Sequence, residues 1–276
     1  MSANSSLALF KRDADHVATR TTLILLPPFP FDHRMWEAVA RRFEGIPVIA
    51  VDPPGFGASM LPSETPALEL YADLVAESIR AHGVTSAVVC GNGMGGYAAM
   101  AMVERHPRLV RGIGLIGTHA AIDEPSVRAR RTEMAITAFM GRAQDELVDE
   151  LPAMVSRETA RDHSDVVDMA AGWVRGARDD AIAWAQRAMS IRPGRLEMLQ
   201  RADVKGVVVR GEQDRYTTAS QADQLARAVG ESYVVNVPRA GHLIPIEQPG
   251  AVARAVLGLY ARCLRGNVAT RRKDDE

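Results

Sequence analysis

Short apolar runs that alternate with amphipathic helical patterns are the feature that most limits the fold of this chain. Runs that are apolar throughout are typical of parallel strands whose two faces are both covered. Between them lie segments such as 68–83, in which apolar residues recur at helical spacing and a glycine ends the pattern. The alternation predicts an α/β fold with a doubly wound, mostly parallel sheet. The predicted strands span 22–26, 48–51, 87–90, 110–116, 207–210 and 233–237.

The alternation stops between about residues 122 and 190, where helical patterns follow one another without a strand. This stretch predicts a helical lid inserted into the α/β core. The chain then divides into a first core part (1–121), the lid (122–190), a second core part (191–264) and a disordered tail (265–276). Large apolar side chains of the lid are candidates for the floor of a pocket, although methionine at helical spacing is more often core filling. They are Met134, Met140, Met154, Met169, Trp173, Trp184 and Met189.

The charge balance of the chain is close to neutral, with 33 basic and 34 acidic residues and a formal net charge of -1. No overall field draws such a chain to nucleic acid or to an anionic membrane, so a small-molecule partner is expected. The sequence begins without a basic segment ahead of a long apolar run, and no run of about 18 apolar residues occurs. These features predict a cytoplasmic protein and give no signal for its oligomeric state.

The stretch VVCGNGMGG at 88–96 joins an apolar run to a helical pattern through a glycine-rich turn. Read through Gly91, Gly93 and Gly96, it matches the G-x-G-x-x-G of dinucleotide-binding proteins. Read as G-x-S-x-G, it matches a nucleophile elbow in which glycine stands in place of the serine at position 93. A dinucleotide site needs an acidic residue about 20 positions on, and the next strand ends in Gly-Thr-His at 117–119. The second interpretation is therefore favoured.

Other segments of the chain support this choice. LILLPPFPFDHRMWEAVA, VDPPGFGAS, YADLVAESIRAHGV, VVCGNGMGGYAAMAMVERHP, VVVRGEQDRYT and AGHLIPIEQP follow one another in a characteristic order and spacing. With these six segments the chain resembles the α/β-hydrolase superfamily. It is most similar to the branch of 3-oxoadipate enol-lactonase, menaquinone-pathway and meta-cleavage-product hydrolases. The resemblance extends over roughly residues 22–264 and is weakest across the lid.

The resemblance implies roles for particular residues. It places the catalytic base at His242 in AGHLIP, the acid that orients it at Asp214 in GEQD, and the nucleophile position at Gly93. The backbone amides of Met94 and Phe29 are implied as the donors of an oxyanion hole. Two of these roles have simpler alternatives: His242 as a surface histidine in a loop, and Asp214 as a carboxylate at the amino end of the next helix.

Two departures from the family pattern bear on the chemistry. Gly93 has no side chain, so no acyl-enzyme can form there. Where the family usually has His-Gly, this chain has Pro27-Pro28, and the prolines fix the backbone that aims the Phe29 amide. A serine on this elbow is held in a strained conformation that costs on the order of 1 to 3 kcal/mol, which glycine avoids, so the elbow itself is expected to persist.

Substrate contacts are predicted for residues around the elbow and in the lid, namely Pro28, Asn92, His33, Trp173 and Trp184. His33 and its neighbour Asp32 are equally compatible with a role in starting the helix that follows them. Cys90 is not expected to replace the nucleophile, because a residue that ends a central strand points into the core. No metal and no cofactor are expected: Asp162, His163, Asp165 and Asp168 cluster in the lid sequence, but charged residues on such a helix usually form a solvated face, and nothing indicates ligand geometry.

Three hypotheses about function follow. The first is an enzyme that keeps the His-Asp dyad and the oxyanion hole and performs general-base chemistry, as a lyase, a cyclase or a water-mediated hydrolase, on a small apolar carbonyl substrate. The second is a non-catalytic pseudo-hydrolase that binds a ligand under its lid. The third is an engineered serine-to-glycine variant of a serine esterase or lactonase, which leaves Pro27-Pro28 unexplained.

Overall fold

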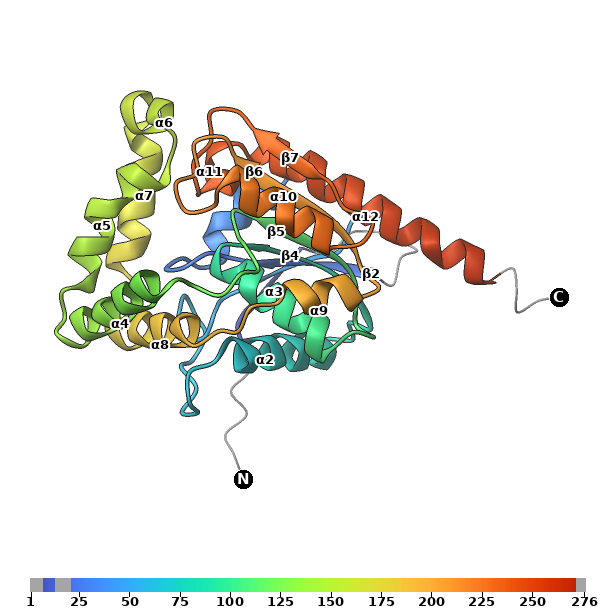
Figure 1. Cartoon of the computed structure of the whole chain (residues 1–276), viewed down its shortest axis with the longest axis horizontal. Helices are drawn as coiled ribbons and strands as arrows, with labels where there is room; N and C mark the ends of the chain where they lie inside the picture. The colour runs from blue at the N-terminus through green and yellow to red at the C-terminus, as the bar shows by residue number, and fades with distance from the viewer. Residues whose placement is uncertain (1–6, 13–20, 272–276) are drawn as a thin grey trace.

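The structure is a computed structural model that describes residues 7–12 and 21–271. Its centre is a seven-stranded sheet in the order β1-β3-β2-β4-β5-β6-β7, in which β1 pairs with β3 antiparallel and all other neighbours are parallel. Helices cover both faces of this sheet (Figure 1). The strands are β1 Leu9–Arg12, β2 Thr21–Leu26, β3 Val48–Val51, β4 Ser86–Asn92, β5 Val110–Ile116, β6 Lys205–Gly211 and β7 Val234–Val237.

The helices of the core form two layers. One layer contains α2 Leu68–Ala81, α3 Met94–Arg105, α9 Leu196–Arg201 and α10 Ala219–Ala228, and the other contains α1 Glu37–Ala40, α11 Ile244–Glu247 and α12 Pro249–Arg271. A short 3-10 helix, η1 His33–Trp36, precedes α1. Every residue of β2 and β4 is buried between these layers, which explains why their central residues are apolar without alternation. The predicted doubly wound α/β fold is confirmed.

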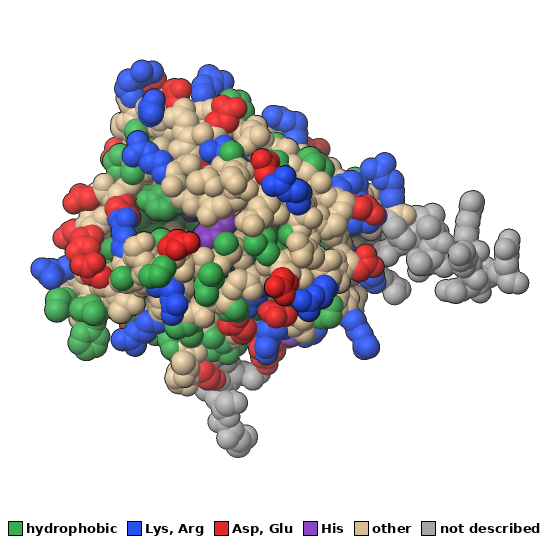
Figure 2. Space-filling view, in the orientation of Figure 1, with side chains coloured by type: hydrophobic (Ala, Val, Ile, Leu, Met, Phe, Trp, Pro, Cys, Tyr) green, Lys and Arg blue, Asp and Glu red, His purple; other side chains and the backbone are tan. Residues whose placement is uncertain are grey.

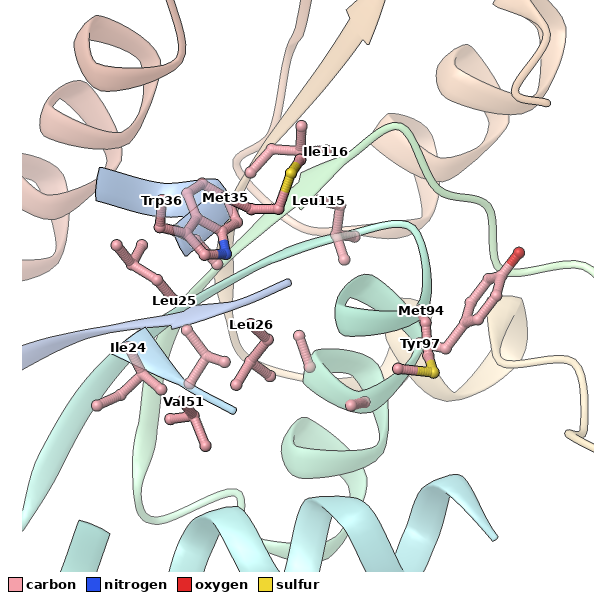
Figure 3. Close-up of a cluster of buried hydrophobic side chains, with 14 of the residues drawn as sticks. Ile24, Leu25, Leu26, Met35, Trp36, Val51, Met94, Tyr97, Leu115 and Ile116 are labelled. Atoms are coloured by element: carbon pink, nitrogen blue, oxygen red, sulfur yellow. The ribbon is translucent and has the colours of Figure 1, made fainter. Parts of the chain in front are cut away.

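The side chains of β2 show how the core is shared between the two layers. Leu25 lies on the side of Met35 and Trp36, while Ile24 and Leu26 point to the opposite side (Figure 3). All five side chains are fully buried. This alternation follows from the period of two along a strand, so β2 packs against both helical layers.

Six of the seven strands are in the predicted places, with small differences at their ends. The sequence analysis missed β1, a strand of four residues, LFKR, at the edge of the sheet. Edge strands face solvent and often carry charged side chains, so this one lacks the apolar signal of its neighbours. A second difference concerns α12, which continues to Arg271 beyond the expected boundary at 264. The predictions for residues 1–6, 13–20 and 272–276 lie outside the described residues.

Five helices lie between β5 and α9 with no strand among them, as the predicted lid requires. They are α4 Pro125–Phe139, α5 Ala143–Met154, α6 Arg157–Asp162, α7 Ser164–Arg175 and α8 Asp179–Ser190. Figure 1 shows α4 to α8 standing to one side of the sheet. Of the lid methionines, Met140 and Met169 are exposed to solvent, so neither is core filling.

Glycines at the β4–α3 turn allow a backbone approach that no other residue permits. A Cβ atom on Gly95 would lie 2.1 Å from the Leu26 carbonyl oxygen, and one on Gly91 would lie 2.1 Å from the Gly95 carbonyl carbon. Gly172 in α7 offers a contrast, because a Cβ atom there meets nothing within 4 Å. The helix α3 can therefore begin against the end of β2 only with small residues in this turn.

Replacing Gly95 and Gly172 with alanine is expected to change the free energy of unfolding in opposite directions. Gly95→Ala should destabilise the protein by about 1 to 3 kcal/mol or more, because the backbone must move to relieve the overlap. Gly172→Ala should stabilise it by about 0.5 to 1 kcal/mol, because alanine is the better helix former. Urea unfolding of the two variants and the wild type measures both values. A Gly95→Ala variant as stable as the wild type would contradict this description of the turn.

Candidate active site

The residues of the site come from the carboxyl ends of five parallel strands. Phe29 follows β2, Gly93 follows β4, Gly117 follows β5, Asp214 follows β6 and His242 follows β7. Ligands bind at this edge of open α/β sheets, because the loops there converge above neighbouring strands. A Cβ atom on Gly117 would lie 3.2 Å from Asp214 Oδ2 and 3.3 Å from His242 Nδ1, so these two side chains meet directly above β5.

Gly93 occupies the nucleophile position of the turn, with φ 52° and ψ -115°. A Cβ atom built on it would lie 3.1 Å from His242 Nε2 and 3.2 Å from Pro28 Cβ. Its amide donates to the Ile116 carbonyl at 3.0 Å, and its carbonyl accepts from Thr118 Oγ1 at 3.1 Å. The elbow is thus held on both sides of a residue whose positive φ favours glycine.

His242 and Asp214 form a buried pair. His242 Nδ1 lies 3.1 and 3.2 Å from the two carboxylate oxygens of Asp214. The amides of Tyr216 and Thr217 donate to Asp214 Oδ1 at 2.8 and 3.2 Å. Burial alone would raise the pKa of the Asp214 carboxyl. The charge of His242 and these hydrogen bonds outweigh burial, so the pKa lies below its ordinary value. Thr218, and not Asp214, caps α10, so the alternative role of Asp214 as a cap is wrong.

The two amides implied as an oxyanion hole belong to the start of α3 and to the loop after β2. Met94 is the first residue of α3, where backbone N–H groups have no partner within the helix. In residues 7–12 and 21–271, neither the Met94 nor the Phe29 amide donates to another backbone group. The positive end of the α3 dipole adds to the attraction for a negative oxygen at this place.

Comparison with known proteins identifies the family of this chain. A family model described as "Alpha/beta hydrolase family" matches residues 23–255. The chain belongs to the α/β hydrolase family. No curated protein matches the sequence significantly. Among solved structures, a thermophilic esterase from Thermogutta terrifontis with malate bound is 26% identical, with a TM-score of 0.86 over 93% of each chain.

Two further structures share the fold at lower identity. The enol-lactonase from Burkholderia xenovorans LB400 is 24% identical, with a TM-score of 0.82 over 92% of this chain and 97% of its own. MenH from S. aureus is 18% identical, with a TM-score of 0.83 over 93% of this chain and 98% of its own. This α/β hydrolase therefore has the fold of enzymes that include an esterase and a lactonase.

Asn92 in this α/β hydrolase has a different place from the predicted one. Its side chain is fully buried, and its Nδ2 donates to the Ile116 carbonyl at 3.0 Å and to the His242 carbonyl at 3.3 Å. These bonds tie the end of β4 to the loop that carries the histidine. The predicted substrate contact of Asn92 is replaced by a role in holding His242.

The other predicted substrate contacts divide into two groups. Pro28 lies beside Gly93, and its contact with a substrate stays a prediction. His33 instead binds Asp52 through Nδ1 at 2.8 Å and stacks on Phe10 near the edge of the sheet, which argues against a substrate contact. Asp32 accepts from the Arg34 amide and caps η1, which bears out the simpler interpretation given above.

The two lid tryptophans lie in different surroundings. Trp173 is half buried, with its ring centroid 6.2 Å from that of Phe31, and the Arg34 guanidinium lies 5.4 Å from its ring centroid. The lid helix α7 therefore packs against the loop that carries Phe29. Trp184 in α8 is buried.

Two other sets of side chains could take part in chemistry, a possible cation site and the Cys90 thiol, and the surroundings of each argue against that role. Asp32, His33 and Asp52 lie close enough together to hold a cation, but their side chains bond to Arg34, to one another and to backbone amides. Burial raises the pKa of the Cys90 thiol well above its ordinary value, with Cys263 adding to the effect, so Cys90 stays protonated.

Two cavities of about 460 and 360 Å³ lie away from the dyad. The first is lined by Glu69, Asp73, Glu104, Arg105, His106 and Pro193, and the second is lined mainly by residues of β1, β3, η1 and α1. Neither cavity is lined by His242 or Asp214. Figure 2 shows a hollow beside the lid with hydrophobic side chains around it and a histidine at its edge.

Sequence reasoning missed Tyr216 and Thr118. The Tyr216 ring lies over His242 with centroids 4.9 Å apart, and its amide supports Asp214. Thr118 holds the carbonyl of Gly93. Tyr216 lies two residues after Asp214, and Thr118 follows the strand that ends beside Gly93, so position relative to Asp214 and to the strand end was the available signal.

A buried polar cluster joins the two ends of the lid to α3. Asp123, ahead of α4, pairs with Arg131 at 2.7 Å and with Arg192, which follows α8. Arg192 also lies 4.0 Å from the ring centroid of Tyr97, whose hydroxyl lies 3.2 Å from His119 Nε2. Burial, and then the charge of Arg192, lowers the pKa of His119 to about 4.

Acid is expected to destabilise the protein through His119. The unfolded chain binds a proton at this histidine near its ordinary pKa of 6.5, whereas the folded chain binds it only near 4. Falling pH therefore favours the unfolded state between these values, by roughly 1 to 3 kcal/mol in total. Urea unfolding at several pH values should show this loss in the wild type and a smaller loss in His119→Gln. Equal pH dependence in the two proteins would contradict the assignment.

Proposed function

We propose that this α/β hydrolase is an enzyme that works without a covalent nucleophile, with His242 as general base and Asp214 as the residue that orients it. The substrate is a small, largely apolar carbonyl compound. The observation that carries the proposal is the 3.1 Å distance from His242 Nε2 to the Cβ position of Gly93. An oxygen atom at that place is within hydrogen-bond reach of the ring nitrogen and next to the Met94 amide.

In a hydrolytic reaction, His242 Nε2 takes a proton from a water beside Gly93. The oxygen of that water bonds to the substrate carbonyl carbon, and the electron pair of the C=O bond moves to its oxygen. The Met94 and Phe29 amides donate to this oxyanion. When the pair returns, the bond to the leaving group breaks and the leaving group takes the proton from the imidazolium. Asp214 stabilises the positive ring throughout and keeps its carboxylate.

The same groups also serve reactions that begin with removal of a proton next to a carbonyl. His242 then takes the proton from the carbon next to the carbonyl, and the amides hold the resulting enolate oxygen. When His242 instead takes the proton of a hydroxyl on the next carbon, that hydroxyl becomes a carbonyl, the carbon-carbon bond breaks, and its electron pair forms the enolate that the amides hold. Elimination, cyclisation and carbon-carbon cleavage all start in this way. A positioned base contributes about 10² to 10⁴-fold to the rate and one oxyanion donor about 10² to 10³-fold, which suits an activated carbonyl and not an unactivated amide.

A non-catalytic ligand-binding role is the main alternative, and the buried dyad weighs against it. A binding protein has no need for a carboxylate that accepts hydrogen bonds from two amides and a histidine ring. Keeping two ionisable groups buried is costly unless they are paired, so the pair is best explained by the chemistry that it supports. An engineered loss of serine would explain Gly93 but not the proline at position 28 beside it.

The substitution Asp214→Asn tests the proposal. Assays use activated aryl esters, enol lactones and 1,3-dicarbonyl compounds, and the exposed Asp223→Asn on α10 is the control. Asp214→Asn should lower kcat at least tenfold with little change in substrate binding, because the ring loses the partner that sets its tautomer. No turnover of any of these compounds by the wild type, together with unchanged ligand binding in Asp214→Asn, would favour the binding role.

A further inference from the structure

The segment that joins lid helices α5 and α6 is bonded directly to the loop of His242. The Met154 carbonyl accepts from the His242 amide at 2.6 Å and from the Leu243 amide at 3.2 Å. A Cβ atom on Gly241 would lie 2.5 Å from the Val155 carbonyl carbon, so only glycine permits this approach. The backbone of the histidine loop thus rests on the lid and not on the sheet alone.

Glu247 joins the same two segments through a single carboxylate. One of its oxygens accepts from the Ser156 amide in the lid at 2.7 Å, and the other accepts from the Gly241 amide at 2.7 Å. The side chain is half buried, and no lysine or arginine among the described residues forms an ion pair with it. Its charge is therefore balanced by backbone dipoles on both sides, and hydrogen bonds to an ionised acceptor are stronger than neutral ones.

A corresponding contact joins the lid to the loop that carries Asp214. Gln213, which precedes Asp214, accepts from the Arg157 amide at 2.9 Å and donates to Glu158 at 2.6 Å. The backbone amide of Gln213 in turn donates to the Ala240 carbonyl at 2.9 Å. Lid residues 154–158 consequently bond to both loops of the dyad.

We propose that Glu247 is a positioning residue that sets the distance between His242 and Asp214 by fastening the lid to the histidine loop. Gln213 makes the corresponding attachment on the acid side. The lid is then a support of the base as well as a cover, and a movement of residues 154–158 would alter the dyad. The inference rests on the proposed function only in naming His242 as the base.

The test is Glu247→Gln, which keeps the size of the side chain but leaves one carbonyl oxygen to serve two amide donors. The readouts are hydrogen exchange of the Gly241 and Ser156 amides and the NMR signal of the His242 Nδ1 proton. We expect about tenfold or faster exchange at both amides and a broadened or lost Nδ1 proton signal. Glu197→Gln, on the exposed face of α9, is the control and should match the wild type.

An unchanged Nδ1 proton signal in Glu247→Gln would overturn the proposal, even if exchange at the two amides became faster. If that variant does not fold, Gln213→Ala removes the acid-side contact instead and should broaden the same signal. An unchanged signal in a folded Gln213→Ala would then overturn the proposal. Neither readout needs turnover, so a protein that converts none of the activated carbonyl compounds yet shows these changes refutes the proposed function and leaves the positioning role standing.

Discussion

Replacing His242 with alanine is expected to lower kcat by about 10² to 10⁴-fold on whichever activated carbonyl compound the wild type converts. Substrate binding should change little, because the ring contributes to proton transfer and not to the bulk of the pocket. The reason is geometric: Nε2 lies 3.1 Å from the Cβ position of Gly93, and no other base is placed there in the described residues. Steady-state kinetics with a separate measurement of binding distinguish the two effects.

The control for this substitution is His82→Ala, at an exposed histidine after α2 that bonds to a carbonyl of that helix. That variant should keep the rate of the wild type. If His242→Ala kept it as well, the turnover would arise elsewhere in the protein, and the dyad would be a structural pair only.

Replacing Gly93 with serine is expected to create a serine esterase. The new hydroxyl would stand beside His242 Nε2 and the oxyanion amides, so an aryl ester should give a burst of its phenol and an acyl group bound to the protein. Intact-protein mass spectrometry would detect that group. The change has a cost, because φ at this position is 52° and the new Cβ atom lies 3.1 to 3.2 Å from Nε2 and Pro28. We expect a loss of about 1 to 3 kcal/mol in the free energy of unfolding.

Gly93→Ala is the matched control, since it has the same backbone strain and the same Cβ atom without the hydroxyl. It should lose similar stability and form no adduct. A folded Gly93→Ser protein that forms no adduct would mean that the ring or the amides are not aimed at this position.

The sequence predicts the fold well because the core follows rules that act along the chain. The central residues of β2 and β4, at 23–26 and 87–90, are all apolar and buried, so their pattern identifies these strands. The edge strand β1 is missed because half of its four residues are charged and its stability comes from pairing with β3. The continuation of α12 to Arg271 is missed because polar composition is a weak guide to where a helix stops.

The sequence predicts only those site residues whose roles are given by recognisable motifs. His242, Asp214 and Gly93 stand in recognisable segments, and the structure brings them together. Asn92 was misassigned because a buried amide that bonds to two carbonyls looks the same in sequence as one that faces a ligand.

The support of the dyad by Glu247 depends on a bond to Ser156, 91 positions away. No local pattern carries such a contact, so only the folded chain can reveal it.

The mass of the wild-type protein during turnover tests the central claim most directly. Samples quenched while an activated ester or lactone is being converted should contain only unmodified protein, because His242 acts through a proton and not through a covalent bond. Product should meanwhile accumulate over many turnovers. A protein-bound acyl group that forms and decays at the rate of turnover would contradict the account.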